Sequence, residues 1–459
     1  MSAPAHQLAI AKAKEKVKDA TVPSAVFFLY CIFVFEYFFR LSARIPGMGQ
    51  LRPTMVLFLL LTIALFMQAD KVRDKLKEPP VQIILVLFMY LFVSFPLVEW
   101  PGSVIRQHVQ PFILAVCFLF FTAMVVDTDR RLKLFVLLFV VLQAWRVIEP
   151  FGNYLLTGEL GGRTHIGGGE FAGRLNGARA DVINANGLGF VIVTTLAFMH
   201  FLMGGSKSFM IRFAYYGLAG TFLYALMLTS SRGAFVTLIV LVAFMIWDSK
   251  RKVLFVGLLA VASVLAWSGL SDFHKDRYLS LISSDTSTAS GATADGRIRG
   301  MTTEFRLGLK RPIFGHGLGT TPEAKVNQLG GRRQAAHNLY AELLIEIGAI
   351  GAIIFLAYLF KLRSAVKDNL LAFKRAVRQG VPVDGFMLNL NKALLVVFWV
   401  YAVYSINYFG LSQDYWYIFG GLCIAFARSI KRNREVYFGT ESAPLQGAGG
   451  AGTKRPLSA

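Results

Sequence analysis

The chain has 459 residues, of which 55% are hydrophobic, 16% are charged and 40 are phenylalanine. This composition is too apolar for a soluble domain and fits repeated membrane spans. The net charge of +21 is scattered along the chain, so it favours topology signals that face anionic lipid over nucleic-acid binding.

Twelve apolar segments are candidates to cross a bilayer, for which a helix needs roughly 20 mainly apolar residues. They lie at 24–39, 54–68, 81–95, 111–126, 132–148, 187–203, 213–229, 233–247, 253–270, 338–360, 393–409 and 411–427. Several are short, and two of them could be half-spans. The pattern predicts an all-α polytopic membrane domain over 24–427. A cytoplasmic segment, 1–23, precedes it, and a cytoplasmic, disordered tail, 428–459, follows it.

Lysine and arginine gather in alternate connections, at 69–80, 127–133, 204–212, 248–252 and 361–392. The positive-inside rule therefore places these connections and both termini in the cytoplasm. Two longer insertions, 149–186 and 271–337, are then extracytoplasmic. The three cysteines fall inside predicted spans and indicate neither a disulfide framework nor a thiolate metal site.

The first insertion ends in GRLNGARADVINANGLG, just before a predicted helix. Its glycine-rich backbone would let a bulky anionic head group approach Arg174 and Arg179 closely. A plain solvated loop explains either arginine alone. Together with other arginines on the same face, which topology does not require, they indicate an anionic ligand.

Arg232 lies in LTSSRGAF, a very short turn between two predicted spans. An arginine held between helices can present its planar fork to a phosphate. The alternative is a side chain that extends to the membrane interface, as long basic side chains often do. Both interpretations stay open from the sequence alone.

The second insertion contains RIRGMTTEFRLGLKRP, in which Met301, Phe305 and Leu309 recur at helical spacing. This pattern predicts a short amphipathic helix at the membrane surface. Arg297, at the start of this segment, is a further candidate for binding an anion.

His337 ends the second insertion and directly precedes a predicted membrane helix. A neutral imidazole can take a proton from an attacking hydroxyl, although an ordinary interfacial histidine would fit the same position. Asn338 is placed to cap the incoming helix, and Glu342 lies in its first turn. Glu346 shares a face with Glu342, and a carboxyl at that depth usually faces a protein interior. We expect Glu346 either to have a structural role, by pairing with a basic group on a neighbouring helix, or to orient His337 indirectly.

Other sequence patterns resemble known metal or nucleotide motifs, but the structural context that those motifs require is missing. Asp127-Thr128-Asp129 resembles a metal-binding DxD motif but lies in a predicted cytoplasmic turn, so we expect a charged helix connector. GHGLG at 315–319 lacks the strand and helix context of a dinucleotide fingerprint. The histidines do not show metal-ligand spacing. The sequence therefore predicts neither a metal site nor a cofactor.

Three motifs in order, SSRGA, RPIFGHGLG and AHNLYAELLIEIGAIG, resemble the O-antigen ligase and O-antigen polymerase superfamily. The resemblance covers about residues 170–360, with GRLNG and NANGLG as a weaker upstream part. Each motif is short, and it is their order, spacing and shared topology that make the combination specific.

The resemblance implies a metal-independent, inverting bacterial glycosyltransferase of the GT-C class, with about a dozen membrane helices and no cofactor. Such enzymes take a glycan from a polyprenyl (undecaprenyl) diphosphate carrier and transfer it to an acceptor hydroxyl on the periplasmic face of the inner membrane. His337 matches the family histidine thought to activate that hydroxyl. Arg232 and Arg174 match arginines thought to hold the diphosphate, and Arg179 and Arg297 match less closely. Glu346 matches an acidic position after the histidine.

The implied role is O-antigen ligation in surface polysaccharide (lipopolysaccharide) biosynthesis. The implied partners are the carrier-linked donor, a glycan, lipid or protein acceptor, membrane lipid and, as further candidates, a flippase and a chain-length regulator. Polymerisation of repeat units is an alternative within the same superfamily. Solute transport is an alternative of another class, which predicts polar residues near the midplane and paired broken helices.

Overall fold

A computed structural model describes residues 21–167, 170–249, 272–279, 289–408 and 410–438, with isolated positions between 252 and 268. Its longer helices are α2 (Ser24–Phe39), α4 (Pro53–Phe66), α6 (Pro79–Ser94), α8 (Val109–Val125), α9 (Asp129–Thr157), α10 (Ala185–Met203), α11 (Phe209–Thr229), α12 (Arg232–Asp248), α15 (Ala289–Gly308), α17 (Leu339–Arg378), α18 (Gly385–Tyr404) and α19 (Tyr415–Arg432). The shorter ones are α3 (Leu41–Arg44), α5 (Ala69–Val72), α7 (Pro101–Ser103), α14 (Asp272–Leu279), α16 (Thr321–Leu329) and α20 (Arg434–Phe438). Short 3₁₀ helices at Met48–Leu51, Arg73–Lys77 and Phe95–Leu97 and a π-helical segment at Val104–His108 connect some of them.

The chain is an all-α polytopic membrane protein, as its composition predicts. Eight of the described helices are long and apolar enough to cross a membrane. Each predicted span except 253–270 overlaps a described helix, and 253–270 lies largely outside the described residues. The total of twelve spans and the domain bounds stay predictions.

Helix α10 is the centre of the bundle. It packs against α9, α11, α12 and α18, and most of its residues are buried. Its sequence is apolar on every face, which fits a helix that is surrounded by other helices. Helices α8 and α19 form another close pair beside it. These contacts fix the positions of the helix ends on which the candidate site is built.

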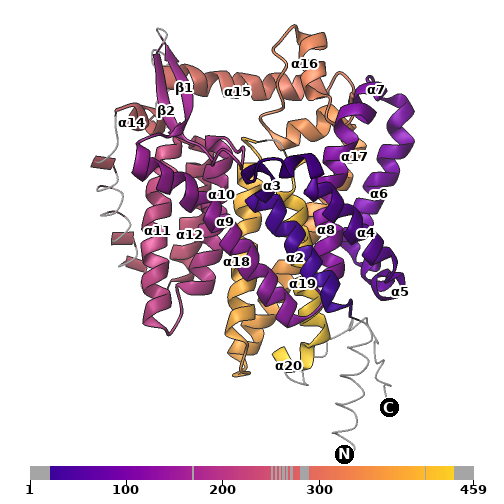
Figure 1. The fold of residues 1–459 in the computed structure, drawn as a ribbon, viewed down its shortest axis with the longest axis vertical. Helices are drawn as coiled ribbons and strands as arrows, with labels where there is room; N and C mark the ends of the chain where they lie inside the picture. Colours follow the sequence, from indigo (N-terminus) through magenta and orange to yellow (C-terminus); the bar gives the residue numbers. More distant parts are fainter. Residues whose placement is uncertain are drawn as a thin grey trace, which may run out of the picture.

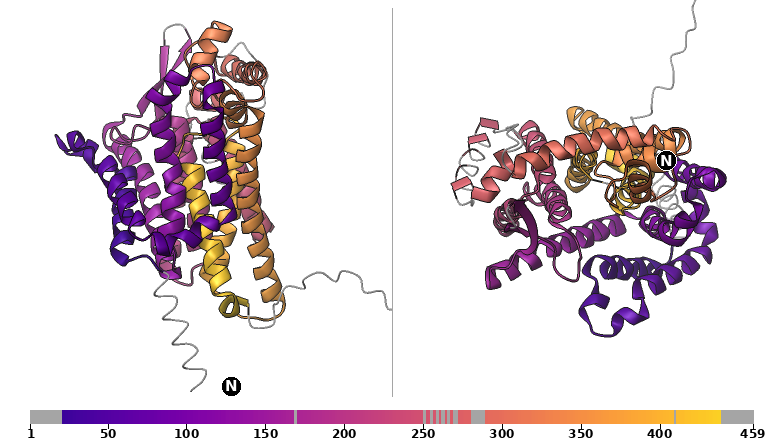
Figure 2. Two further views of the ribbon diagram at one scale, coloured as in Figure 1. Left: turned by 90° about the vertical axis from the view of Figure 1, so that its right-hand side faces the viewer. Right: turned by 90° about the horizontal axis from the view of Figure 1, so that it is seen from above.

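The two insertions lie at one end of the bundle, where α15 runs across the membrane helices (Figures 1 and 2). The first and last described segments pack at the opposite end, on the turn between α8 and α9. The Val22 amide donates to Asp127 at 2.9 Å, and the Tyr437 hydroxyl donates to Asp129 at 2.5 Å. Asp127 also pairs with Lys75 and Arg131. The carboxylates of the DxD triplet therefore serve as the charged connector that we expected.

The first insertion contains an element that the helical prediction missed. Strands β1 (Gly161–Gly167) and β2 (Glu170–Leu175) form an antiparallel hairpin, with Gly162 opposite Arg174. It projects from the loop-bearing end of the bundle (Figure 1). The second insertion carries the predicted helix as α15, in which Phe305 is exposed, whereas Glu304 and Leu307 are buried against the protein. Leu309, just after the end of α15, is also exposed.

Helix α17 is broken at Gly348, where φ is +62° and ψ is −174°. The loop 312–319 fills this break. The His316 amide donates to the Ile345 carbonyl at 2.7 Å, and the Ala349 amide donates to the Pro312 carbonyl at 2.7 Å. A backbone that leaves the helical path inside a membrane must find such partners, because water is not there to supply them. The sequence analysis did not predict this break.

The GHGLG segment in this loop is structural. Gly315, Gly317 and Gly319 all have φ in the left-handed region, and a Cβ at Gly315 would lie 2.5 Å from the Glu346 carbonyl carbon. His316 is fully buried: its Nδ1 lies 2.5 Å from a Glu99 carboxylate oxygen, and its Nε2 lies 3.3 Å from the Leu307 carbonyl. The segment thus fastens the loop to the bundle.

Candidate active site

Arg174 and Arg232, two of the predicted phosphate-binding residues, meet at one turn. Arg174 ends the hairpin, and its Nε donates to the Thr229 carbonyl at 2.8 Å. Its terminal nitrogen donates to Asn186 in α10 at 3.0 Å and to the Ser230 carbonyl at 3.4 Å. The guanidinium therefore ties the hairpin to the turn between α11 and α12 and to the first turn of α10.

Arg232 is the first residue of α12, directly after that turn. Ser230 adopts the left-handed conformation, with φ of +48°, and the Ser231 side chain caps the helix by accepting from the Ala234 amide. Arg232 is 5% exposed, so its side chain is packed within the protein. This burial disfavours the alternative in which Arg232 extends to the membrane interface.

Helix α14 packs on the same turn. His274 is buried, and its Nδ1 hydrogen-bonds the Ser230 hydroxyl. The Tyr278 hydroxyl donates to the Met227 carbonyl at 3.3 Å, and its ring contacts Phe235 at 5.0 Å between centroids. His274 showed no spacing that singled it out in the sequence, because its partner lies 44 residues away.

His337 lines an open groove of about 740 Å³ between α15 and α16. Gly296 and Gly300 of α15 and Arg332 of the preceding loop line the same groove. The Gln334 side-chain amide lies within hydrogen-bonding distance of His337 Nε2. A neutral imidazole in an open groove has the properties of a general base.

Glu304 is buried beneath His337 and was not predicted as part of the site. It accepts from the His337 backbone amide at 3.0 Å and from Lys325 Nζ at 2.7 Å. Lys325 also donates to the Ala335 carbonyl at 2.9 Å. These contacts fix the main chain that carries the imidazole. The sequence signal was weak, because a glutamate within an amphipathic helix ordinarily points to solvent.

The supporting residues have separate structural tasks. The Asn338 side chain caps α17 by accepting from the Tyr340 and Ala341 amides, as its position predicts. The Glu342 carboxylate accepts from the Gly410 and Leu411 amides at 2.7 and 3.1 Å. Neither contact reaches the His337 side chain.

Glu346 fastens the loop that fills the α17 break. Its carboxylate accepts from the Gly319 amide and the Thr321 hydroxyl, both at 2.7 Å. Structural pairing was one of its two expected roles. Its partners are an amide and a hydroxyl, however, and not the basic group on a neighbouring helix that the sequence analysis considered.

The two less closely matched arginines are on other segments than the turn of Arg232. Arg179 is exposed in the turn that follows the hairpin, and no contact with Arg174 or Arg232 is seen among the described residues. Arg297 is on α15, between Gly296 and Gly300, but its side chain lies outside the described part of the chain.

The C-terminal end of α18 connects the arginine turn to the His337 helix. The Leu339 amide donates to the Ser405 carbonyl at 2.8 Å, and the Tyr404 hydroxyl donates to the Asn186 carbonyl at 2.8 Å. On the other side, Gly233 lies against Asn407. His337, Arg174 and Arg232 are therefore grouped around one helix end, on the loop-bearing end of the bundle.

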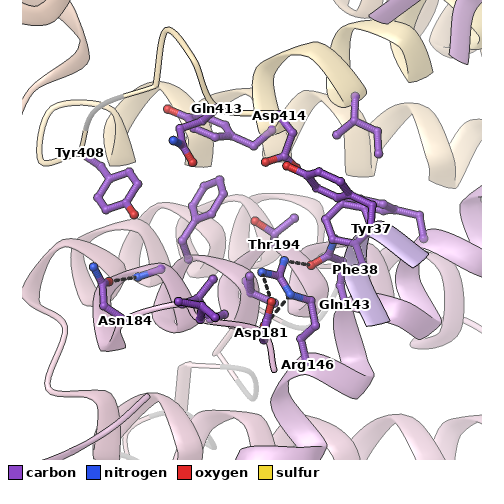
Figure 3. A pocket seen from close by; sticks show the side chains of 18 of the residues that line it. Tyr37, Phe38, Gln143, Arg146, Asp181, Asn184, Thr194, Tyr408, Gln413 and Asp414 are labelled. Carbon is purple, nitrogen blue, oxygen red and sulfur yellow. Dashed lines mark hydrogen bonds and ion pairs between the residues drawn. The ribbon is translucent and has the colours of Figure 1, made fainter. Parts of the chain in front are cut away.

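A second cavity, of about 380 Å³, lies between α2, α9, α10, α18 and α19. Arg146 forms a bidentate pair with Asp181 at 2.8 and 2.9 Å and donates to Gln143 at 3.0 Å (Figure 3). Tyr37 and Asp414 line the cavity as well (Figure 3). The sequence analysis missed this cavity, because its walls come from segments far apart in the chain.

An apolar groove of about 340 Å³ lies between α6, α8 and the loop 312–319. Phenylalanines from both helices and from the loop line it, and Glu346 lies at its base. Phe92 and Ile105, also in its lining, are 82% and 61% exposed, so the groove opens toward the surface of the bundle that lipid would cover.

Comparison with known proteins tests the resemblance directly. Residues 217–356 match the family model described as O-antigen ligase. This range includes the turn of Arg232, helix α15, His337 and the break in α17. No curated protein matches the sequence. Residues 217–356, which contain the arginine turn and the His337 groove, are thus similar to the O-antigen ligase family, and this supports the family that the sequence motifs resemble.

Proposed function

We propose that this protein transfers a glycan from a polyprenyl diphosphate carrier to an acceptor hydroxyl, on the extracytoplasmic face of a bacterial inner membrane. The O-antigen ligase domain supports a ligase-like glycan-transfer role in surface polysaccharide biosynthesis. The lipid carrier, the inverting and metal-independent chemistry, the acceptor and the orientation in the membrane belong to the proposal.

This proposal is supported mainly by one observation. Arg174, in the hairpin, donates hydrogen bonds to the turn that precedes Arg232, and this turn lies near the C-terminal end of α18, which also contacts the helix that follows His337. A diphosphate leaving group carries negative charge that fixed guanidinium groups can stabilise. Arginines held by backbone contacts would do so without rearranging during the reaction.

The reaction follows from this arrangement. The acceptor oxygen attacks the anomeric carbon of the donor sugar, the bond from that carbon to the diphosphate oxygen breaks, and its electron pair leaves with the diphosphate. His337 Nε2 takes the proton of the acceptor hydroxyl, which replaces the Gln334 amide as its hydrogen-bond partner. The apolar groove beside α6 and α8 offers a place for the isoprenoid tail.

His337→Ala in reconstituted membranes is the principal test. We expect loss of glycan transfer with unchanged thermal stability, because the His337 side chain is exposed while Glu304 holds the backbone amide, which alanine keeps. Long carrier-linked chains that accumulate in cells would indicate ligation, and single unpolymerised repeats would indicate polymerisation. Normal transfer by the variant would contradict the role of His337.

Arg232→Lys tests the phosphate site separately. Lysine keeps the charge but loses the planar fork, so we expect lower transfer with a raised KM for the donor. Arg333→Lys is the matched control, because Arg333 is exposed and pairs with Glu323 outside the arginine turn. Equal losses in both variants would argue against a phosphate-binding role for Arg232.

A further inference from the structure

The cavity between α2, α9, α10, α18 and α19 combines aromatic faces with polar groups. Its rings come from several helices and loops: Tyr37, Phe38, Phe139, Phe190, Tyr401, Tyr408 and Tyr415. Its polar groups include the side chains of Gln143, Asn184, Gln413 and Asp414. The volume of about 380 Å³ lies within the range of sites for small molecules.

The charged side chains that line the cavity balance in number: Arg40 and Arg146 against Asp181 and Asp414. Each of the three guanidinium nitrogens of Arg146 donates to Asp181 or Gln143 (Figure 3). Arg40 is exposed at the end of α2, so a phosphate among the remaining groups would lie next to the carboxylates of Asp181 and Asp414, which disfavours an anion. This separates the cavity from the diphosphate site proposed at Arg174 and Arg232.

A metal ion or an apolar chain would not suit this cavity either. Both Asp181 oxygens accept hydrogen bonds from Arg146, and the described residues contain no group of three His, Cys, Asp or Glu side chains suited to a metal. An apolar chain would leave the buried amides and carboxyls without water, which is costly. A neutral ligand with many hydroxyl groups satisfies both kinds of lining.

We propose that this cavity binds a sugar residue of one of the two glycans that take part in the transfer. A sugar ring presents an apolar C–H face to aromatic side chains and a rim of hydroxyls to amides and carboxyls. The Gln413 amide makes no side-chain hydrogen bond with the described residues and is available to the ligand. The assignment to a transferred glycan rests on the proposed function.

The position of the cavity agrees with this ligand. Asn184 and Gly187 line it, while Asn186, between them, accepts from Arg174. The first turn of α10 therefore separates the cavity from the diphosphate site by a single helix. At the rim, Val182 has φ of +56° and is 76% exposed. Backbone strain at a β-branched residue persists where surrounding contacts enforce it, and such strain concentrates at ligand sites.

The test measures saturation transfer to free glucose, galactose, mannose and N-acetylglucosamine by ligand-observed NMR, with the protein in nanodiscs. Gly187→Leu fills the cavity, because a Cβ at this position points among Ile183, Asn184 and Tyr408, 3.6 to 3.8 Å away. Gly187→Ala is the matched control, since a methyl group there makes only ordinary contacts. We expect at least one sugar to bind the wild type and the alanine control, and binding to fall about tenfold or more in the leucine variant.

Gln413→Ala is a second variant that deletes no side-chain hydrogen bond among the described residues, and we expect it to weaken sugar binding with unchanged thermal stability. Displacement of the sugar by a short-chain prenyl-diphosphate sugar would assign the cavity to the donor. Displacement by acceptor glycan would assign it to the acceptor. No binding of any of the four sugars, equal binding by the leucine variant, or displacement by neither substrate would overturn the proposal.

His337→Ala keeps the two proposals apart. We expect it to lose transfer and to keep sugar binding, because His337 does not line this cavity. A His337→Ala protein that still transfers glycan would refute the proposed mechanism while leaving the sugar-binding result to be judged on its own.

Discussion

Gly348→Ala is the sharpest test of how the loop 312–319 is built into the bundle. At Gly348, φ of +62° with ψ of −174° is a conformation that only glycine adopts readily, and enforcing it on another residue costs about 1–3 kcal/mol. In addition, the new Cβ would lie 2.2 Å from the Ile313 carbonyl oxygen and 2.7 Å from the Gly315 nitrogen. Such overpacking costs roughly 1–3 kcal/mol.

We therefore expect Gly348→Ala to destabilise the protein by roughly 2–6 kcal/mol, the sum of these two effects. Since the loop must move to admit the methyl group, transfer activity should fall as well. Gly220→Ala in α11 is the matched control, because a Cβ there meets nothing within 4 Å and Gly220 does not have positive φ. It should be neutral or slightly stabilising, because alanine favours a helix over glycine by about 1 kcal/mol.

The assay is thermal unfolding in nanodiscs, measured beside glycan transfer for the wild type and both variants. Wild-type stability in Gly348→Ala would refute the inference that the loop backbone fills the break. Lowered stability with full transfer would support the packing argument, but it would show that this loop does not affect the His337 end of α17.

Three further outcomes are expected. Glu346→Ala should destabilise the protein more than Glu346→Gln, because glutamine keeps an acceptor for one of the two loop donors; equal unfolding temperatures would contradict this. Arg146→Ala should cost about 3–5 kcal/mol by leaving Asp181 buried and unpaired. An Arg146→Ala, Asp181→Ala double variant should cost less than the sum of the single ones, whereas additive losses would argue against the pair. Burial alone would raise the pKa of Glu99, but hydrogen bonds from neighbouring side chains outweigh it and leave the pKa below the ordinary 4.5. The Glu99→Gln variant lacks the stabilisation that this carboxylate provides. The wild type should thus be more stable than the variant above pH 4.5, and this difference should vanish as the pH falls through the lowered pKa of Glu99. A difference in stability that does not depend on pH would refute this expectation.

The features that the sequence predicted are those set by local chemistry. Apolar runs predict helices in a bilayer whatever their neighbours are, because the backbone must bond to itself there. Asn338 caps α17 because an N-cap depends on residues only two or three positions away. The two serines before Arg232 likewise shape its turn through their own backbone and side-chain contacts.

What the sequence could not predict depends on distant partners. IEIGAIG reads as continuous helix, and only the loop 312–319 makes the break at Gly348 tolerable. Glu304 looks like a solvent-facing residue until Lys325 and the His337 amide are brought to it. The cavity lined by Arg146 requires five helices to be assembled, and no spacing along the chain encodes it.

The positions of lysine and arginine along the chain identified some residues of the proposed site but not all of them. They singled out Arg174 and Arg232 because topology does not require them, and the structure brings both to one turn. They also pointed to Arg179, which is exposed elsewhere, and they could not reveal that uncharged residues of α18 organise the group. Ser405, Tyr404 and Asn407 carry no charge, yet they contact α17, α10 and α12, which hold the residues proposed to act on one ligand. For this protein, the end of α18 is therefore the place where substitutions without any change of charge should uncouple phosphate binding from proton transfer.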